Sequence, residues 1–278
     1  MLGKILLYGI DVSQDIDRGV NWLQDAVMDD NQFAEYLLGK TYLRGELVER
    51  DLDQAEALLR QSAAQSNKFA QYTLGKALLD GDLLEQNTYE ALELLRKSAA
   101  QNFPWAQYLY GKLLSKGDVT IKDLPTAIKL IEKAAEKNIP NAAYLAGKLR
   151  LTEKEIQDYF LAVLNFEFSA ESGNSYAEYM LGKIYLNGKG VEKDTDLALS
   201  YLKLSAEHGN PYAEQLLYNL SHSKNPFIAM SAFRLLQHLA CIIQNRIEDE
   251  RKGKEGMTDK KLRRIIDAKR EAHGLKHG

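Results

Sequence analysis

Aromatic and lysine side chains recur at a fixed spacing in this chain, and their chemistry suits ligand binding. Five tyrosines, at separations of 36, 36, 36 and 35 residues, are each followed four residues later by a lysine, and four of them are preceded by an aromatic residue three positions earlier. Residues at i, i+3 and i+7 share one face of an α-helix, so they could hold an acidic or aromatic peptide through lysine contacts and ring stacking. We call this set the ladder; its residues are Phe33, Tyr36, Lys40, Phe69, Tyr72, Lys76, Trp105, Tyr108, Lys112, Tyr144, Lys148, Tyr176, Tyr179 and Lys183.

A structural role explains the same spacing. Tyrosines repeated within one chain can pack between helices with the hydroxyl at the rim. Lysines can lie along apolar surface, or pair with acidic neighbours such as Glu35 and Glu178. Repetition also follows from copying a stable unit. Both interpretations of the ladder stay open at the level of the sequence.

The other reactive side chains do not form a catalytic set. The sequence has no phosphate-binding loop, no nucleophile motif and no metal-ligand spacing. The single cysteine, Cys241, cannot form an intrachain disulfide, which fits a reducing compartment. The histidines fall late in the chain and outside any compact metal triad; they are His208, His222, His238, His273 and His277. We therefore expect a non-catalytic, cytoplasmic protein with no cofactor and no metal ion.

A glycine-containing block returns five times and indicates that the ladder lies on repeated helices. Its glycines are Gly39, Gly75, Gly111, Gly147 and Gly182, at separations of 36, 36, 36 and 35 residues. Such a period is typical of a helical repeat array. Glycine inside a helix costs about 1 kcal/mol relative to alanine, so its recurrence predicts that another helix approaches closely at this position. The apolar stripe of each second helix then needs stacked neighbours to bury it.

Capping residues predict where the helices begin and end. In the second full unit the pattern predicts one helix over about 68–79 and a second over about 88–101. Side chains that can cap a helix start precede helical runs at Asp15, Asp51, Asn87, Asp123 and Asp194. The second helices are expected to end at residues that tolerate the left-handed conformation, which are Asn67, Asn102, Asn138, Gly173 and Gly209.

The period divides the chain into four regions. It extends back to Gly3, so residues 1–30 form a partial N-terminal repeat, and we expect the chain to be a fragment of a larger protein. Residues 31–209 hold five units, residues 210–250 form C-terminal capping helices, and residues 251–278 form a basic tail with a short helix. A long helix over about 227–251 is expected to cover the end of the array with its apolar residues, Phe227, Met230, Phe233, Leu236, Ala240 and Ile243.

The repeated block and its continuation resemble the Sel-one-like repeat (SLR), a relative of the tetratricopeptide repeat. The clearest copy is Ala177–Asn210, and the resemblance covers about Gly3–Asn210. It implies an all-α fold, a right-handed superhelical solenoid of antiparallel helix pairs. It also implies a protein–protein interaction scaffold, with a protein or peptide ligand in a concave groove lined by the first helices. The unit around Leu149–Ala162 departs from the pattern, since it lacks the turn glycine and is one residue short.

The C-terminal tail differs from the rest of the chain in charge. Residues 251–278 contain ten Lys and Arg against four Asp and Glu, a net charge of +6, whereas the whole chain carries −3. This asymmetry favours nucleic acid or an acidic protein surface as a partner of the tail. A solvated basic helix explains the same charge. The candidate contacts are Lys260, Lys261, Arg263, Arg264, Lys269 and Arg270.

A second resemblance concerns the same end of the chain. The residues from Ser231 onward are similar to the C-terminal ends of relaxases from mobile elements of Gram-positive bacteria. This resemblance implies an alternative function, in which the chain is an accessory region that aids DNA mobilisation through partner or DNA contacts.

The apolar run near the N-terminus is too short to span a bilayer, so we expect no membrane partner.

Overall fold

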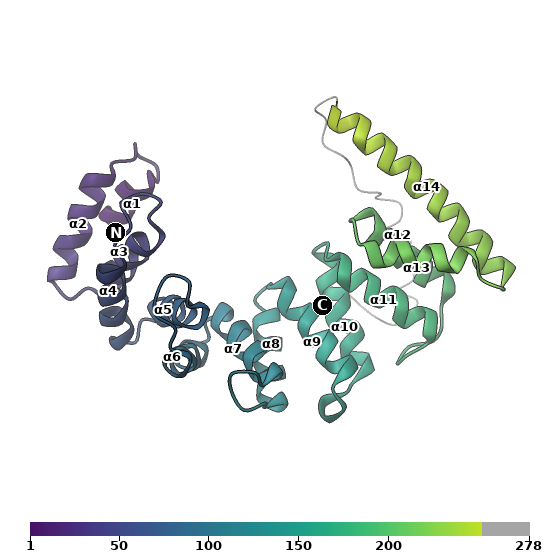
Figure 1. The fold of residues 1–278 in the computed structure, drawn as a ribbon, viewed down its shortest axis with the longest axis horizontal. Helices are drawn as coiled ribbons and strands as arrows, with labels where there is room; N and C mark the ends of the chain where they lie inside the picture. The colour runs from purple at the N-terminus through teal and green to yellow at the C-terminus, as the bar shows by residue number, and fades with distance from the viewer. Residues whose placement is uncertain (252–278) are drawn as a thin grey trace. The chain divides into compact units, whose positions relative to one another are not determined.

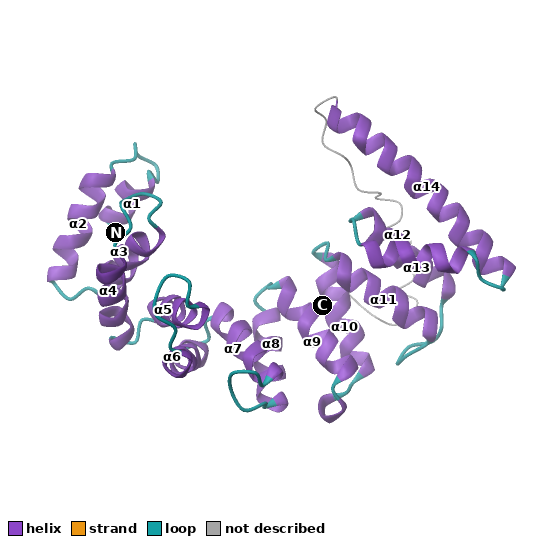
Figure 2. Ribbon diagram, viewed as in Figure 1, coloured by secondary structure: helices purple, strands orange, loops and turns teal. Residues whose placement is uncertain are grey.

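The chain folds into α-helices that follow one another in antiparallel pairs, as the sequence predicted (Figure 1). The structure is a computed structural model that describes residues 1–251, with side chains up to residue 240 except those of Pro140 and His238. This part contains fourteen α-helices and one 3-10 helix (Figure 2). The α-helices are α1 (Leu2–Tyr8), α2 (Ile16–Met28), α3 (Gln32–Arg44), α4 (Leu52–Ala64), α5 (Lys68–Asp80), α6 (Thr88–Ala100), α7 (Pro104–Lys116), α8 (Leu124–Ala135), α9 (Pro140–Thr152), α10 (Tyr159–Glu171), α11 (Ser175–Asn187), α12 (Thr195–Glu207), α13 (Pro211–Ser221) and α14 (Pro226–Arg251).

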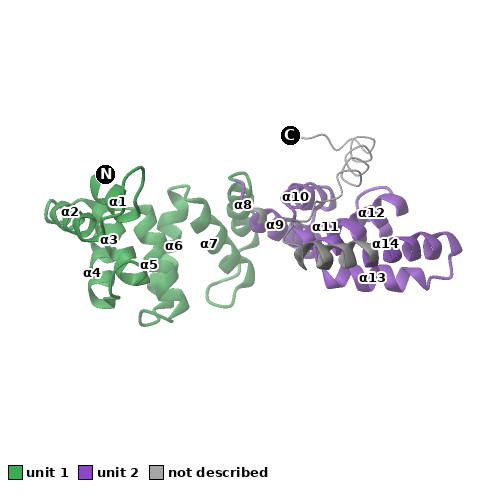
Figure 3. Cartoon of the chain, turned by 90° about the horizontal axis from the view of Figure 1, so that it is seen from above, with its two compact units in different colours: residues 1–137 green, residues 138–278 purple. Residues whose placement is uncertain are grey.

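The chain divides into two compact units (Figure 3). Unit 1 covers Met1–Lys137 and contains α1–α8, and unit 2 covers Asn138–Gly278, where the described helices are α9–α14. Within each unit the two helices of a pair pack on each other, and the second helix also packs on the first helix of the next pair. Each pair therefore buries the apolar stripe of its neighbour, as a repeat array requires.

The repeated glycines lie where the two helices of a pair touch. A Cβ atom added at Gly39 would stand 3.1 Å from the side chains of Leu58 and Leu59. One added at Gly111 would stand 2.8 Å from Ile131 Cγ1 and 3.0 Å from the carbonyl oxygen of Ala127. The close helix approach predicted from the glycine spacing is therefore confirmed. It commits one face of each first helix to its own partner helix and leaves the ladder on another face.

Polar side chains cap the second helices at the predicted places. The caps of α2, α4, α6, α8 and α12 are Asp15, Asp51, Asn87, Asp123 and Asp194, and each accepts a hydrogen bond from a backbone N–H three residues ahead. The predicted left-handed backbone is confirmed at Asn102, Asn138, Gly173 and Gly209. The prediction for Asn67 was wrong, because α4 ends at Ala64 and Ser66 is the left-handed residue, with a φ of 66°.

Asn67 joins two repeats instead of ending a helix. Its Oδ1 accepts hydrogen bonds from two N–H groups in the first turn of α5, and its Nδ2 donates to the carbonyl oxygen of Gln32, 3.0 Å away at the start of α3. Asn210 makes the equivalent bonds to α13 and to the carbonyl oxygen of Ser175 in unit 2. Both asparagines are buried, so their amide groups depend on these partners.

A buried polar contact also joins the two helices of a pair. Glu35 of α3 is 2% exposed and accepts hydrogen bonds from Gln65 Nε2 at 2.9 and 3.0 Å. Burial raises the pKa of Glu35, the charge of Asp30 adds to the rise, and the bond from Gln65 opposes it. In unit 2 the side chain of Glu178 is fully buried, and its carboxylate oxygens lie 2.9 Å from His208 Nδ1. Each carboxylate thus has the hydrogen-bond partner that burial demands.

The irregular repeat replaces its missing glycine turn with a 3-10 helix. α9 ends at Thr152, the 3-10 helix covers Lys154–Ile156, and the side chain of Asp158 caps α10 by accepting from Leu161 N–H. The turn glycines of the other repeats end their helices in the left-handed conformation, whereas Glu153 is extended. A non-glycine residue avoids the left-handed region here because the chain tightens into i to i+3 hydrogen bonding instead.

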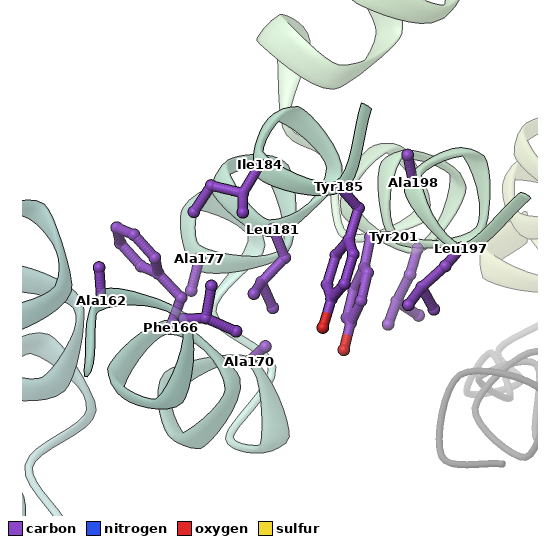
Figure 4. Packing of buried hydrophobic residues seen from close by; sticks show 12 residues of the cluster. Ala162, Phe166, Ala170, Ala177, Leu181, Ile184, Tyr185, Leu197, Ala198 and Tyr201 are labelled. Carbon is purple, nitrogen blue, oxygen red and sulfur yellow. The ribbon is translucent and has the colours of Figure 1, made fainter. Parts of the chain in front are cut away.

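Aromatic residues fill the core beside this irregular repeat (Figure 4). Phe166 is fully buried, and a Cβ atom added at Gly147 would stand 2.9 Å from its ring. The rings of Tyr185 and Tyr201 stack, with centroids 5.9 Å apart and planes 8° apart. The core of unit 2 therefore combines glycine at a close helix contact with large buried rings.

The long helix α14 packs on the preceding helices, but most of the residues that make this contact differ from the predicted ones. Its buried edge consists of Ala232 and Leu239, with Leu235 and Leu236 partly buried, and it contacts α12 and α13. The prediction was right for Leu236 and wrong for four exposed residues, Phe227, Met230, Phe233 and Ala240, while the side chain of Ile243 lies outside the described set. The helix carries apolar residues on two faces, and spacing alone does not tell which face is buried.

Replacing Gly111 by leucine is expected to lower the free energy of unfolding by about 1–3 kcal/mol, because the added side chain overpacks the contact with Ile131. Chemical denaturation followed by far-UV circular dichroism measures this change. Lys116→Leu, at an exposed position of the same helix, is the control and should stay within about 0.5 kcal/mol of the parent. An unchanged or raised stability of Gly111→Leu would contradict the close helix contact.

His208→Ala is expected to destabilise the fold by about 1–3 kcal/mol, because Glu178 stays buried and loses a hydrogen-bond donor. His208→Gln introduces the residue type that donates a hydrogen bond to Glu35 in unit 1. This variant should therefore lose less free energy of unfolding than His208→Ala. Thermal denaturation of both variants compares the two losses. If they are equal, the donor at this position does not contribute to stability.

Candidate functional site

The ladder residues lie on the first helices of successive pairs. α3, α5 and α7 carry the part in unit 1, and α9 and α11 carry the part in unit 2. The five ladder tyrosines that precede a lysine by four residues are half-buried. Three of the aromatic residues three positions before them are more open, and these residues, Phe33, Trp105 and Tyr176, are 60%, 51% and 48% exposed. The alanines and glycines of the repeated block take the buried positions of the same helices. Within each unit the ladder is therefore a surface feature that rests on a rigid helix contact.

Rings from neighbouring repeats touch in unit 1. The ring centroids of Tyr36 and Phe69 are 5.7 Å apart, and those of Phe69 and Phe103 are 5.2 Å apart. Tyr72 also meets Phe103 at 5.2 Å in an edge-on arrangement. Phe103, the N-cap residue of α7, makes two of these contacts but was absent from the predicted ladder. The sequence interpretation missed it because the repeat pattern predicts no aromatic residue at a cap.

A second row of rings runs through unit 2. The centroids of Tyr144 and Tyr176 are 6.3 Å apart, and those of Tyr176 and Tyr212 are also 6.3 Å apart. Tyr179 lies 6.0 Å from Tyr212. Tyr212, on α13, was absent from the predicted ladder, although it follows Tyr176 by 36 residues. The repeat period alone was a sufficient signal to find it.

Three ladder lysines lie over the tyrosine that precedes them. Lys40 Nζ is 5.7 Å from the ring centroid of Tyr36, and the matching distances are 6.0 Å for Lys112 over Tyr108 and 5.3 Å for Lys183 over Tyr179. These distances are in the range of cation–π attraction. Lys76 and Lys148 occupy the same positions of their repeats and are exposed.

The ladder lysines lack acidic partners. In the described part of the chain none of the five lies within ion-pair distance of a carboxylate, although Arg60 on a second helix pairs with both Glu56 and Glu90. The alternative that lysines pair with Glu35 and Glu178 is excluded by burial of those two carboxylates, which bond to other side chains. The ladder thus places lysines that form no ion pair with the described residues beside aromatic rings.

Three tyrosine hydroxyls of the ladder have a raised pKa and so stay protonated over a wider pH range than usual. Burial raises the pKa of Tyr72, Tyr108 and Tyr144, and the charge of Asp80 adds to the rise at Tyr72. Neutral hydroxyl groups can both donate and accept hydrogen bonds. A carboxylate ligand would therefore find hydroxyl donors beside the lysine ammonium groups.

Other features of the described residues do not coincide with the ladder. A surface hollow of about 520 Å³ lies at the turn between α3 and α4, around Tyr42 and Glu49–Asp53. His208 bonds to Glu178, and His222 Nδ1 lies 2.9 Å from the carbonyl oxygen of Tyr218. Within the described residues, no three potential ligands among His, Cys, Asp and Glu gather as a metal site. No described helix combines the length and the apolar character needed to cross a membrane.

The predicted nucleic-acid contacts of the tail fall outside the described residues. They are Lys260, Lys261, Arg263, Arg264, Lys269 and Arg270, and the same holds for His273, His277 and the side chain of His238.

Comparison with known proteins places the repeats in one family. A family model described as the Sel1 repeat matches residues 1–31, 32–67, 68–103, 106–139 and 175–210, which is more than half of the chain. A search among curated proteins gave no match. The resemblance of the C-terminal end to relaxases finds no support in these comparisons.

Two solved structures have a similar fold. One is a protective antigen present in uropathogenic Escherichia coli strains and displaying an SLR fold, with a TM-score of 0.75 and 24% identity, covering 98% of this chain and 56% of that chain. The other is a Sel1 repeat protein from Oxalobacter formigenes, with a TM-score of 0.63 and 28% identity, covering 79% of this chain and 64% of that chain. The chain spans less than two thirds of either structure. With its repeats, helix pairs and close glycine contacts, the chain belongs to the Sel1 repeat family.

Proposed function

We propose that this chain is a non-catalytic scaffold that binds another protein, and that the ladder holds an extended segment of the partner rich in carboxylate and aromatic groups. The observation that carries this proposal is the set of ladder lysines without acidic partners in the described structure. Surface cations gain from a complementary potential in a partner, which steers association and selects acidic over basic segments. Membership of the Sel1 repeat family supports a scaffold, since such repeats typically bind proteins.

Repetition of the ladder explains how weak contacts add up. A single exposed ion pair contributes about 0–1 kcal/mol, too little for a stable complex. Three repeats in unit 1 present Lys40, Lys76 and Lys112 on α3, α5 and α7. Ring contacts join the first two of these repeats to the start of α7. A partner segment that contacts several ladder repeats loses its translational and rotational freedom once, and each further contact then forms at a high effective concentration. The affinity should therefore depend on the number of ladder repeats that the segment contacts.

Charge reversal of Lys40, Lys76 and Lys112 to glutamate is expected to weaken binding of a glutamate–tyrosine copolymer at least about tenfold, as loss of three ion pairs predicts. Fluorescence anisotropy with the labelled copolymer measures the affinity. The matched control reverses three exposed lysines on second helices, Lys97, Lys129 and Lys133, and changes the net charge by the same amount.

The control separates local recognition from general electrostatics. If the ladder variant and the control variant bind the copolymer equally well, the ladder is not the binding surface. Circular dichroism should show unchanged helix content in both variants, because the changed lysines are exposed or half-buried at the surface and surface charges contribute little to folding.

The charge of the tail favours a second candidate function. Residues 251–278 carry +6, so we propose nucleic-acid contact through this segment as the alternative, including the accessory role at a relaxase that the C-terminal resemblance implies. A chain ending at residue 251 is expected to lose salt-dependent binding to DNA that the full chain shows. Titration of both chains with a labelled duplex at two salt concentrations tests this. DNA affinity that survives the truncation, or is absent from the full chain, excludes the alternative.

A further inference from the structure

The outer face of α14 is apolar although the helix already has a buried edge. Phe227, Met230 and Phe233 are 62%, 53% and 53% exposed, while Ala232 and Leu239 on the opposite edge are buried against α12 and α13. Packing of α14 on its own chain therefore does not use the three large side chains. Three such residues within two turns form a contiguous apolar surface on a helix.

Positive charge borders this apolar surface. Arg234 Nη2 lies 3.4 Å from Met230 Sδ, and no described carboxylate lies within ion-pair distance of Arg234. Lys224 precedes the helix, and the sequence from residue 215 to 247 contains no Asp or Glu. The face is thus apolar at its centre and cationic at its margin.

We propose that the outer face of α14 docks an amphipathic helix of a partner protein, with the apolar side of that helix against Phe227, Met230 and Phe233 and carboxylates along its flank opposite Arg234 and Lys224. The anchors lie at i, i+3 and i+6, so they extend about 9 Å along the axis and match about two turns of a facing helix. Aromatic and methionine side chains adapt well to such a contact. This surface lies on α14 and works independently of the ladder.

Charge complementarity favours an acidic helix over the chain's own tail or a second copy as the partner of this face. The chain's own tail carries +6 and would meet Lys224 and Arg234 as like charges. A second copy docked face to face about a two-fold axis would bring the Arg234 side chains of both copies to the same contact. An acidic amphipathic helix satisfies the apolar centre and the cationic margin together.

The test uses the full chain and two synthetic peptide probes of about five helical turns with the same leucine stripe. One probe carries glutamates on its flanks and the other carries lysines. Fluorescence anisotropy should show the acidic probe binding at least about tenfold more tightly than the basic probe. Equal affinity for both probes, or no binding of the acidic probe, overturns the proposal.

Variants locate the binding surface. The triple change Phe227→Ser, Met230→Ser and Phe233→Ser should weaken binding of the acidic probe at least about tenfold. The matched control changes three exposed apolar residues of unit 1, Leu83→Ser, Val119→Ser and Ile121→Ser, and should bind like the parent. If the triple variant binds as tightly as the control, the face is not the site.

Charge exchange provides a second test that does not depend on the folding of the triple variant. Arg234→Glu should weaken the acidic probe and strengthen the basic one, which a purely structural role of Arg234 would not produce. If Arg234→Glu leaves the preference between the probes unchanged, the assigned partner chemistry is wrong.

Two other possible partners of this face, a membrane surface and a second copy of the chain, are tested directly. Sedimentation with vesicles of phosphatidylglycerol and phosphatidylcholine should leave the parent in the supernatant, and analytical ultracentrifugation should show the same mass for the parent and the triple variant. Vesicle binding that the triple variant loses would assign the face to a membrane surface. Self-association that the triple variant loses would assign it to a second copy, and either result overturns the proposal.

Discussion

The contact between the two helices of each pair is the constraint on which the other features depend. At Gly39 and Gly111 the first helix lies so close to the second that the backbone itself forms the interface. Because a Cβ atom would stand only 3.1 Å from the second helix at Gly39 and 2.8 Å from it at Gly111, the contact favours glycine and sets how each first helix is rotated about its own axis. That rotation is what leaves a tyrosine half-buried and the lysine four residues later at the surface. Within each unit, neighbouring repeats keep this rotation, and rings such as Tyr36 and Phe69, or Tyr144 and Tyr176, meet.

Hydrogen bonds complete what the apolar contacts leave open at the ends of the helices. Ser62 and Ser98 donate to carbonyl oxygens of Gln32 and Lys68 at the starts of the paired first helices, and Asn67 donates to Gln32 from the next repeat. The first turn of a helix has unsatisfied N–H groups, and Asn67 Oδ1 accepts from two of these groups in α5. A backbone carbonyl oxygen has two lone pairs, so those of Gln32 and Lys68 can accept a side-chain bond as well as a helical one. The single side-chain amide of Asn67 forms hydrogen bonds to two repeats. A helix that contains small residues throughout can thus be held in place by polar groups at its ends.

Most of the fold could be predicted from the sequence because each feature recurs in several repeats, so each inference rests on several copies. The period, the caps such as Asp51 and Asn87, and the close approach at Gly111 were all predicted, and each depends on local geometry. The outward side of α14 could not be predicted, since Phe227 and Leu236 satisfy the same helical spacing. Asn67 was assigned to the wrong helix end because asparagine suits both a left-handed exit and an N-cap. Phe103 was missed because its contacts with Phe69 arise from tertiary packing at a cap position.

The junction before α7 differs from the junction before α5 in the kind of force that holds it. At Asn67 the joint consists of directional hydrogen bonds, which weaken steeply when donor and acceptor move apart or tilt. At Phe103 the equivalent joint has no side-chain cap, and the Phe103 ring packs against Phe69 and Tyr72 of α5. Apolar contact is non-directional, so this joint depends less on the alignment of single atoms than the joint at Asn67 does. We expect a bending load on unit 1 to shift the rings at Phe103 before it breaks the bonds of Asn67, which would change the spacing of the ladder residues on either side of Phe103 first.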